Sequence, residues 1–321
     1  MGRLTGLTID EFEHAMRGVE GRYIPVRKST GDWHIRHIAL DGFELMVGYN
    51  GGGSIYQGAC GPGNAGLFFP LSEGGSVLVN GEQANVSTLS WLATSRDFHV
   101  YNSDAMAWMG VSIDCETVAH WLDLTHEDFR PAIQQHLLAP VGDARVERLK
   151  GLINRIFEVC DAGEDVLQGA APRTVSSQLS WAIYEAVQSM TFEKQVAQGR
   201  PRLSRGKILD RTLQLLEAAG SEPVQILDLC RASDVSSRTL HAVFNEHFGI
   251  SPYRFLVLQR IRNIHDALRD AGDEETVAGI CARFGVWDFG RFSGLYKRIY
   301  GVHPSAAMAK KSPSRANKPL Q

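Results

Sequence analysis

The sequence lacks the runs that would carry a chain into or across a membrane. No stretch approaches the roughly 20 apolar residues that a bilayer-spanning helix needs. The first residues, Met1-Gly2-Arg3-Leu4-Thr5, are followed by acidic residues and include no apolar core of a signal peptide. We therefore expect a cytoplasmic protein that makes no membrane contact.

Paired cysteines are also missing. No C-x-x-C pair occurs, and the scattered thiols are typical of a reducing compartment, not of a disulfide framework. Two of them are interpreted as small packing residues, whereas the one in Ala59-Cys60-Gly61-Pro62 is expected in a loop where it can be exposed. The five cysteines are Cys60, Cys115, Cys160, Cys230 and Cys281, of which Cys230 and Cys281 are the two packing residues.

Residue patterns for catalysis or metal binding do not stand out. We find no nucleophile with a neighbouring base, no phosphate loop and no dinucleotide fingerprint. A metal site in a small barrel would need a His-x-His pair, a following Glu and a later His. His34 and His37 instead point to opposite faces of a strand, and His99 lies in a later strand. We expect no catalytic residue, no metal and no cofactor.

What the chain does have is an uneven distribution of charge. Its 321 residues suggest about two domains, and its net charge of −3 is unremarkable in size. Residues 200–321, however, hold 19 basic and 12 acidic side chains, whereas residues 1–199 hold 14 and 24. A basic C-terminal block joined to an acidic N-terminal one indicates that the C-terminal part meets a polyanion.

The N-terminal part has the texture of β-structure over residues 23–113. Short runs at 33–38 and 43–47 are bounded by Gly and Asp, as strands usually are. Asn50-Gly51-Gly52-Gly53 and Val79-Asn80-Gly81-Glu82 are turn signals, and the second predicts a hairpin. We expect a small barrel or a double-sheet jelly roll. Its aromatic side chains are interpreted as core, although they could line a ligand cavity, and no effector-binding residue is named: Trp33, Tyr49, Trp91 and Trp108.

From residue 114 to about 197 the pattern becomes helical. Two sets of apolar residues recur with a 3.6-residue period, and their helices would either cover the barrel or form a dimer face. Gln198-Gly199-Arg200-Pro201 predicts a linker, and the basic tail 310–321 is expected to be disordered. The two sets are Val146, Leu149, Leu152, Ile153 and Ile156, and Leu179, Ile183, Ala186, Val187 and Met190.

Residues 224–304 contain two copies of one pattern. The first copy runs from Leu229-Cys230-Arg231-Ala232-Ser233-Asp234 to Phe248-Gly249-Ile250-Ser251-Pro252. The second runs from Ile280-Cys281-Ala282-Arg283-Phe284-Gly285 to Tyr300-Gly301-Val302-His303-Pro304. The offset is 51 residues before the turn (Cys230 to Cys281) and 52 after it (Leu240 to Phe292), so the second turn is one residue longer.

Each copy is interpreted as a helix, a tight turn and a second helix. Asp234 and Gly285 occupy the turns, where a left-handed backbone is tolerable. Ser236 and Asp288 are natural N-caps of the following helices. Apolar residues at i, i+4 spacing then face inward and leave the opposite face free for a DNA major groove. The inward pairs are Leu240 with Phe244 and Phe292 with Tyr296.

This doubled motif resembles that of the AraC-type bacterial transcription regulators over roughly residues 205–309. Gly249-Ile250-Ser251-Pro252-Tyr253 matches the segment that closes the family's first unit, and residues 258–268 look like its connecting helix. The chain departs from the family at 301–307, where the Ser before Pro and the later Tyr-Arg are missing, and at Gly294, where Arg or Lys is common. We therefore expect the first unit to supply most of the specificity.

The resemblance implies which residues face DNA. Arg238 and Arg291 are the expected bidentate contacts to guanine, and Asn245 or His241 could read a base edge or a phosphate. Arg262, Lys297 and Arg298 are expected to contact phosphates, which position the protein without reading sequence. The base-reading set is Ser237, Arg238, His241, Ala242, Asn245, Phe289, Gly290, Arg291 and Gly294.

The segment Gly75-Ser76-Val77-Leu78-Val79-Asn80-Gly81-Glu82 and the strands through Trp108 resemble, more loosely, the cupin-like effector domain of many AraC-type proteins. The expected fold is α+β and multidomain: a cupin-like β-barrel with covering helices and an all-α double helix-turn-helix domain. The expected boundaries are 1–199 for effector binding and dimerisation, 200–309 for DNA binding and 310–321 for the tail.

The leading hypothesis is a sequence-specific transcription regulator, and not an enzyme. Its expected partners are double-stranded DNA, a small-molecule effector, a second copy of the chain and, if it activates, RNA polymerase. One alternative is a cupin-like enzyme domain tethered to DNA, which would need a bound metal. Another is a regulator controlled by a protein partner, which a barrel filled by its own side chains would favour.

Overall fold

The computed structural model describes residues 2–29, 31–72, 75–94, 96–124, 134–140, 144–162, 171–196 and 205–309. It divides into an N-terminal unit, residues 1–23 with 30–202, and a C-terminal unit, residues 24–29 with 203–321. The expected linker at 198–201 and tail at 310–321 lie outside the described residues, so the expected domain boundaries stay predictions. No helix of the described ranges is both long and apolar enough to cross a bilayer.

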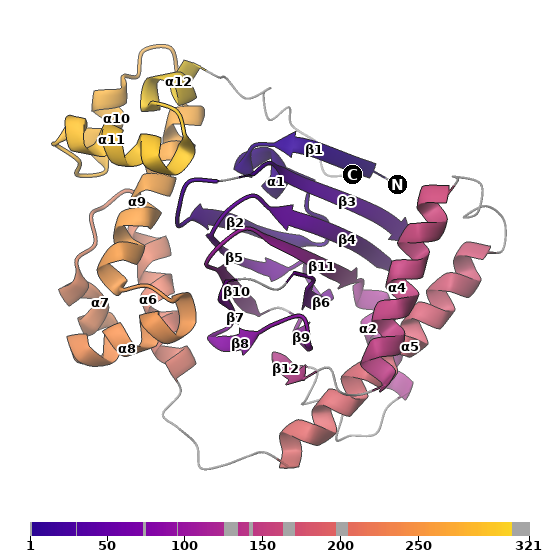
Figure 1. The fold of residues 1–321 in the computed structure, drawn as a ribbon. Coiled ribbons are helices and arrows are strands. Elements are labelled where there is room, and N and C mark those ends of the chain that lie inside the picture. The colour runs from indigo at the N-terminus through magenta and orange to yellow at the C-terminus, as the bar shows by residue number, and fades with distance from the viewer. Residues whose placement is uncertain are drawn as a thin grey trace. The chain divides into compact units, whose positions relative to one another are not determined.

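The N-terminal unit is built on two antiparallel sheets (Figure 1), which confirms the expected β-rich half of an α+β protein. The seven-stranded sheet has the order β1 (Gly2–Leu7), β3 (Trp33–Leu40), β4 (Phe43–Asn50), β11 (Met106–Ile113), β6 (Ala65–Pro70), β9 (Thr88–Leu92) and β12 (Leu137–Pro140). The five-stranded sheet has the order β2 (Val19–Pro25), β5 (Ser54–Cys60), β10 (Asp97–Asn102), β7 (Val77–Val79) and β8 (Glu82–Ala84).

Three of these elements differ from the expectation that β-structure runs from 23 to 113. Strand β1 and helix α1 (Ile9–Ala15) precede that range, and β12 lies inside the part expected to be helical. Strand β1 is an edge strand whose residues are mostly exposed, and it therefore shows no apolar alternation in the sequence. Strand β12 is only four residues long and pairs with β9, which a periodicity argument cannot detect.

The two predicted turns have different roles. Val79 pairs with Glu82 across a two-residue loop, and both loop residues have positive φ, 51° at Asn80 and 84° at Gly81. This is the hairpin predicted from the Asn-Gly signal. Residues 50–53 also turn the chain, but they join β4 of the seven-stranded sheet to β5 of the five-stranded sheet, so they form a connection between sheets.

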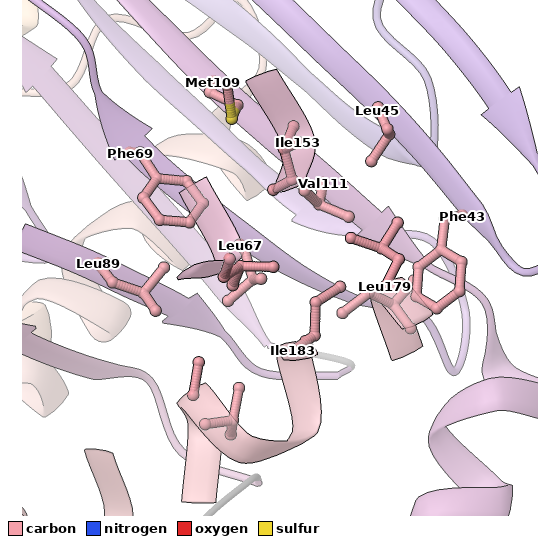
Figure 2. Packing of buried hydrophobic residues seen from close by; sticks show 14 of the residues in the cluster. Phe43, Leu45, Leu67, Phe69, Leu89, Met109, Val111, Ile153, Leu179 and Ile183 are labelled. Carbon is pink, nitrogen blue, oxygen red and sulfur yellow. The ribbon is translucent and has the colours of Figure 1, made fainter. Parts of the chain in front are cut away.

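Helices α2 (Cys115–Leu124), α4 (Ala144–Ala162) and α5 (Ala171–Val196) cover one face of the seven-stranded sheet. Figure 2 shows Ile153 of α4 and Leu179 and Ile183 of α5 packed with side chains of the strands. The sequence left open whether the two periodic faces cover the sheet or form a dimer interface, and the structure places their apolar residues in the core of the unit. The strand side chains labelled there are Phe43, Leu45, Leu67, Phe69, Leu89, Met109 and Val111.

The C-terminal unit is helical, as expected, and the seven helices described in it follow one another without a strand. Figure 1 shows them in colours from salmon through orange to yellow. They are α6 (Arg205–Ala219), α7 (Ile226–Ser233), α8 (Ser237–Phe248), α9 (Pro252–Arg269), α10 (Val277–Arg283), α11 (Phe289–Tyr300) and α12 (Pro304–Ala309).

Helix α9 contacts both halves of this unit through aromatic side chains. Near its beginning, Phe255 lies 5.2 Å from Phe244 and 4.7 Å from Phe248 of α8, measured between ring centroids. Near its end, the buried His265 forms a 2.5 Å hydrogen bond with the Tyr296 hydroxyl and stacks on Tyr300 at 4.0 Å. Because α9 is a continuous helix of 18 residues, it fixes the distance between α8 and α11.

The packing of α4 on the sheet predicts a large loss of stability when Leu149 is truncated. Leu149 is fully buried, so Leu149→Ala leaves a cavity and should lower the free energy of unfolding by about 2–5 kcal/mol. Urea unfolding followed by tryptophan fluorescence measures this, because five of the six tryptophans lie in the N-terminal unit. On the same helix, Val159 is 36% exposed, and Val159→Ala should change stability by less than about 0.5 kcal/mol. Equal effects of the two substitutions would contradict the observed orientation of α4.

Candidate nucleic-acid interface

The first helix-turn-helix is shaped by a left-handed residue and a side-chain cap. Helix α7 ends at Asp234, whose φ of 55° reverses the chain direction, and the Val235 amide donates to the Cys230 carbonyl at 3.1 Å. The Ser236 hydroxyl then accepts from the Thr239 amide at 3.2 Å and starts α8. The residues predicted for the turn and the cap therefore do what the sequence indicated.

The second helix-turn-helix repeats this design with a longer turn. Gly285 takes the left-handed position with φ 70°, and the Asp288 carboxylate accepts from the Arg291 amide at 3.0 Å at the start of α11. The cap follows the left-handed residue by two positions in the first copy and by three in the second. This difference is the extra residue that the repeat offset predicted.

Helix α8 presents a polar face to solvent. Its apolar side chains Leu240, Val243 and Phe244 are fully buried within the C-terminal unit. The residues predicted to read bases all lie on the opposite, exposed side, where they can reach an external partner: Ser237, Arg238, His241, Ala242 and Asn245.

Helix α11 presents a different surface. Phe292, Tyr296 and Ile299 are buried, and the exposed side carries three cations and no acidic residue. At Gly290 and Gly294 the helix surface is bare, because a Cβ at Gly294 would meet nothing within 4 Å. The predicted contact residues exposed on this helix are Phe289, Gly290, Arg291, Gly294, Lys297 and Arg298.

Arg262 is placed differently from its expected role as a phosphate contact. Its side chain is only 5% exposed, and its Nε lies 3.0 Å from an Asp266 carboxylate oxygen on the same helix. A buried guanidinium paired with a carboxylate is not available to a phosphate. The sequence pattern could not reveal this, because the periodicity of α9 does not show that the side of the helix with Arg262 is buried in the folded protein.

One exposed aromatic side chain was missed by the sequence reading. Trp287 lies in the longer turn, directly before the Asp288 cap, and is 75% exposed. A signal was present, since the extra residue of the second turn brings a large apolar side chain to the beginning of the helix expected to meet DNA.

The N-terminal unit contains a hollow between its two sheets. Its volume open to the centre of a water molecule is about 40 Å³. None of the described residues that line it is acidic, basic or a histidine; the lining combines apolar and aromatic groups with two asparagines. The residues that define its chemistry are Met16, Tyr23, Met46, Asn50, Tyr56, Asn102, Met106 and Trp108.

The asparagine side chains that line this hollow are hydrogen-bonded to neighbouring polar groups. The Trp108 indole N–H donates to the Asn50 side-chain oxygen at 2.9 Å, and the Ser54 hydroxyl donates to the Asn102 side-chain oxygen at 2.7 Å. Burial raises the pKa of the Tyr23 hydroxyl well above its usual value, so this group stays protonated and can donate a hydrogen bond. The hollow therefore offers neutral hydrogen-bonding groups and no charge.

The remaining aromatic and cysteine expectations have mixed outcomes. Of the four aromatics that could line a cavity, Trp108 does so, whereas Trp91 is fully buried in the core beneath the helices.

Cys60 was expected in a loop, but it ends β5 and is buried, and burial raises the pKa of its thiol to about 12. Cys281 is buried, as expected of a packing residue, and Cys230 is half-buried. His34 stacks on Tyr49 at 4.8 Å between ring centroids.

His247 in α8 predicts that the C-terminal unit loses stability in mild acid. Burial, together with the nearby Arg205 charge, lowers the pKa of His247 to about 4. In the unfolded chain the pKa of this histidine is near 6.5, so between about pH 6.5 and pH 4 the unfolded chain binds a proton that the folded chain does not bind. The stability that depends on neutral His247 is fully present above about pH 6.5 and decreases as the pH falls toward 4, by about 3 kcal/mol at most.

Hydrogen exchange of α8 peptides in the full chain, compared between pH 7 and pH 4.5, measures this loss. His247→Gln removes the titrating group and should make α8 protection less sensitive to acid than in the wild type. His241→Gln, an exposed position on the same helix, is the control and should behave as the wild type. If His247→Gln also behaves as the wild type, another group is responsible.

Comparison with known proteins agrees with this geometry. A family model described as a helix-turn-helix domain matches residues 229–310, which span both copies. The probable thc operon regulatory protein of Rhodococcus erythropolis is 33% identical over 106 residues, which cover 33% of this chain and 32% of that protein. The transcriptional activator RhaR of Pectobacterium carotovorum is 24% identical over 188 residues, which cover 59% of this chain and 62% of that protein.

These matches span only about a third to three fifths of the relatives' own length. Among solved structures, the AraC-like transcriptional activator CuxR aligns with 83% of this chain and 95% of its own, at 11% identity and a TM-score of 0.44. At that TM-score, the assignment of the C-terminal unit rests on the family model, on the relatives and on the two helix-turn-helix units themselves.

Proposed function

We propose that the C-terminal unit is a helix-turn-helix domain of the AraC type and that the protein is a sequence-specific DNA-binding regulator of transcription. The observation that carries the proposal is the pair of capped helices, α8 and α11, each with a buried apolar side and an exposed side rich in polar or basic groups. Duplex DNA fits such surfaces, because a helix enters the major groove and cations contact phosphates.

The connecting helix supports binding of both units to one DNA duplex. With 18 residues, α9 is about 27 Å long at about 1.5 Å per residue. Successive major grooves on one face of DNA are about 34 Å apart, a distance that α8 and α11 can span from the two ends of such a rod. We propose that the two units occupy neighbouring grooves.

Arginine substitutions test the DNA-binding proposal. Arg238→Ala and Arg291→Ala should each weaken binding to a selected site by about 1–3 kcal/mol and relax base preference at one position. Lys297→Ala should instead weaken binding to all sequences alike and reduce the salt dependence of the dissociation constant.

Fluorescence anisotropy on DNA selected from a random pool, at several salt concentrations, provides these numbers. Arg148→Ala is the matched control, since this arginine is 66% exposed but lies on α4 of the N-terminal unit. The DNA interface is assigned wrongly if Arg148→Ala weakens binding as much as Arg238→Ala and Arg291→Ala do.

For the N-terminal unit we propose control by a small, uncharged effector held in the hollow between the sheets. A charged ligand would lose its hydration there without gaining an opposite charge, which is costly. The open volume suits only a few non-hydrogen atoms, so a ring-sized ligand must displace side chains. Three flexible methionines that line the hollow are suited to such rearrangement: Met16, Met46 and Met106.

A matched pair of probes tests the charge preference. Benzamide and benzoate have nearly the same shape, and we expect benzamide to bind the full chain at least about tenfold more tightly in calorimetric titration. Val100→Phe fills the hollow and should abolish binding, whereas Leu71→Phe, at a position 37% exposed and outside the lining, should not. Preferential binding of benzoate would contradict the proposal. Binding of neither probe, nor of other small neutral molecules, would favour control by a protein partner.

A second copy of the chain is the remaining proposed partner. The outer side of α5 supports it, because Trp181 is 61% exposed there and stacks on Tyr184 at 5.7 Å. A regulator dimerised through this surface would double the number of phosphates that it contacts. RNA polymerase would be a further partner if the protein activates transcription.

A further inference from the structure

Two large aromatic side chains are exposed on either side of the residue that caps α11. Trp287 is 75% exposed and Phe289 is 41% exposed, and Asp288 lies between them. In the described part of the C-terminal unit, only three other large apolar side chains are exposed, and they lie on other elements. Those three are Leu227, Tyr253 and Val302.

Packing within the unit does not account for these two rings. The apolar side of α11 is already supplied by Phe292, Tyr296 and Ile299, all of them buried. Within the described residues, neither Trp287 nor Phe289 stacks on another aromatic ring, although several other rings of the unit do. Exposed aromatic groups that serve no core mark surfaces that bind a partner.

The charges on the same helix identify the kind of partner. Helix α11 carries Arg291, Lys297 and Arg298 and has no acidic residue in its sequence. Charge complementarity therefore favours a polyanion over a protein surface that has few acidic residues. The N-terminal end of a helix-turn-helix reading helix is also the end that contacts base edges.

We infer that Trp287 and Phe289 contact thymine C5-methyl groups in the DNA major groove. The thymine methyl is the one apolar group that base pairs present there, and apolar side chains recognise it by direct contact. This inference rests on the proposed DNA-binding function and adds the chemistry by which the second unit reads sequence. The first unit reads by hydrogen bonds, and the second unit adds apolar contact to the hydrogen bonds expected of Arg291.

The bare surface of α11 supports such a contact. A Cβ at Gly290 would meet only the Asp288 carboxylate oxygen, at 3.8 Å, and a Cβ at Gly294 would meet nothing within 4 Å. Glycine is less favourable than alanine inside a helix, and nothing inside the unit requires glycine at these positions. Without side chains there, the helix can approach the floor of the groove closely enough for the flanking rings to reach a methyl group.

Thymine-to-uracil exchange tests the inference with the wild-type protein, because it removes the methyl group and leaves every hydrogen-bonding atom in place. A site selected from random DNA is prepared with each thymine replaced in turn by deoxyuridine, and the dissociation constants of the full chain are measured. Replacement of a contacted thymine should weaken binding about fourfold, the effect expected from losing the burial of one methyl group.

Variants assign the effect to the two rings. In Phe289→Ala or Trp287→Ala, the thymine and uracil forms of the sensitive position should bind equally. The matched control is Tyr253→Ala, which removes another exposed aromatic ring of the same unit and should keep the fourfold difference. Because the central comparison uses unaltered protein, a variant that folds poorly does not compromise it.

The outcomes separate this inference from the proposed function. Tight, sequence-specific binding that is equal for thymine and uracil at every position would overturn the inference and leave the DNA-binding function standing. A thymine effect that persists in both Phe289→Ala and Trp287→Ala would also overturn it. A chain without any sequence preference for DNA would overturn both.

Discussion

The geometry of the C-terminal unit depends on how α9 is held at its two ends. At one end, Phe255 is stacked within an aromatic cluster of α8, and at the other end His265 is hydrogen-bonded and stacked against tyrosines of α11. These two residues are ten positions apart, or about 15 Å along the helix axis. A change in either contact would tilt one helix relative to the other, and in the proposed complex both helices enter DNA grooves whose spacing is fixed.

The contact of α9 with α8 and its contact with α11 differ in kind, and the difference affects how each of these two helices is positioned. The Phe244, Phe248 and Phe255 cluster is apolar and does not depend on direction beyond ring packing. The contact of His265 with Tyr296 is a buried hydrogen bond, which fixes one orientation and leaves an unsatisfied polar group if either partner is lost. The second unit is therefore positioned more by a directional bond, and the first more by packing.

The sequence predicted the C-terminal unit in more detail than the N-terminal unit, for physical reasons. Turn residues and caps act locally, so Asp234, Ser236, Gly285 and Asp288 could be assigned from their neighbours alone. The strand pairs of the N-terminal unit join residues far apart in the chain. The exposed edge strand β1 and the short β12 therefore left no local signal.

The burial of individual side chains was the other feature that the sequence did not predict. Cys60 and Arg262 were misplaced because the sequence around each residue is compatible with exposure, and only the tertiary structure covers them. The alternation along β11 shows how burial is divided: Trp108 faces the hollow, whereas Met109 and Ile113 face the helices. A strand buried on both faces reads as a continuous apolar run, so the sequence does not show which face borders a cavity.

The difference between the two reading helices also bears on the symmetry of the DNA site. An internal repeat would suggest two similar half-sites, but α8 exposes hydrogen-bonding side chains while α11 exposes cations beside bare backbone. Each helix has one arginine expected to read guanine, but the other exposed groups differ, so the two proposed half-sites differ and one chain would bind a site with a direction. A duplex turned end for end would place the bases that α8 reads by hydrogen bonds against the glycines and aromatic rings of α11, and the base edges left without a partner would oppose binding. In the proposed complex, the orientation of each chain on DNA then follows from the chemistry of its two helices and does not depend on dimerisation.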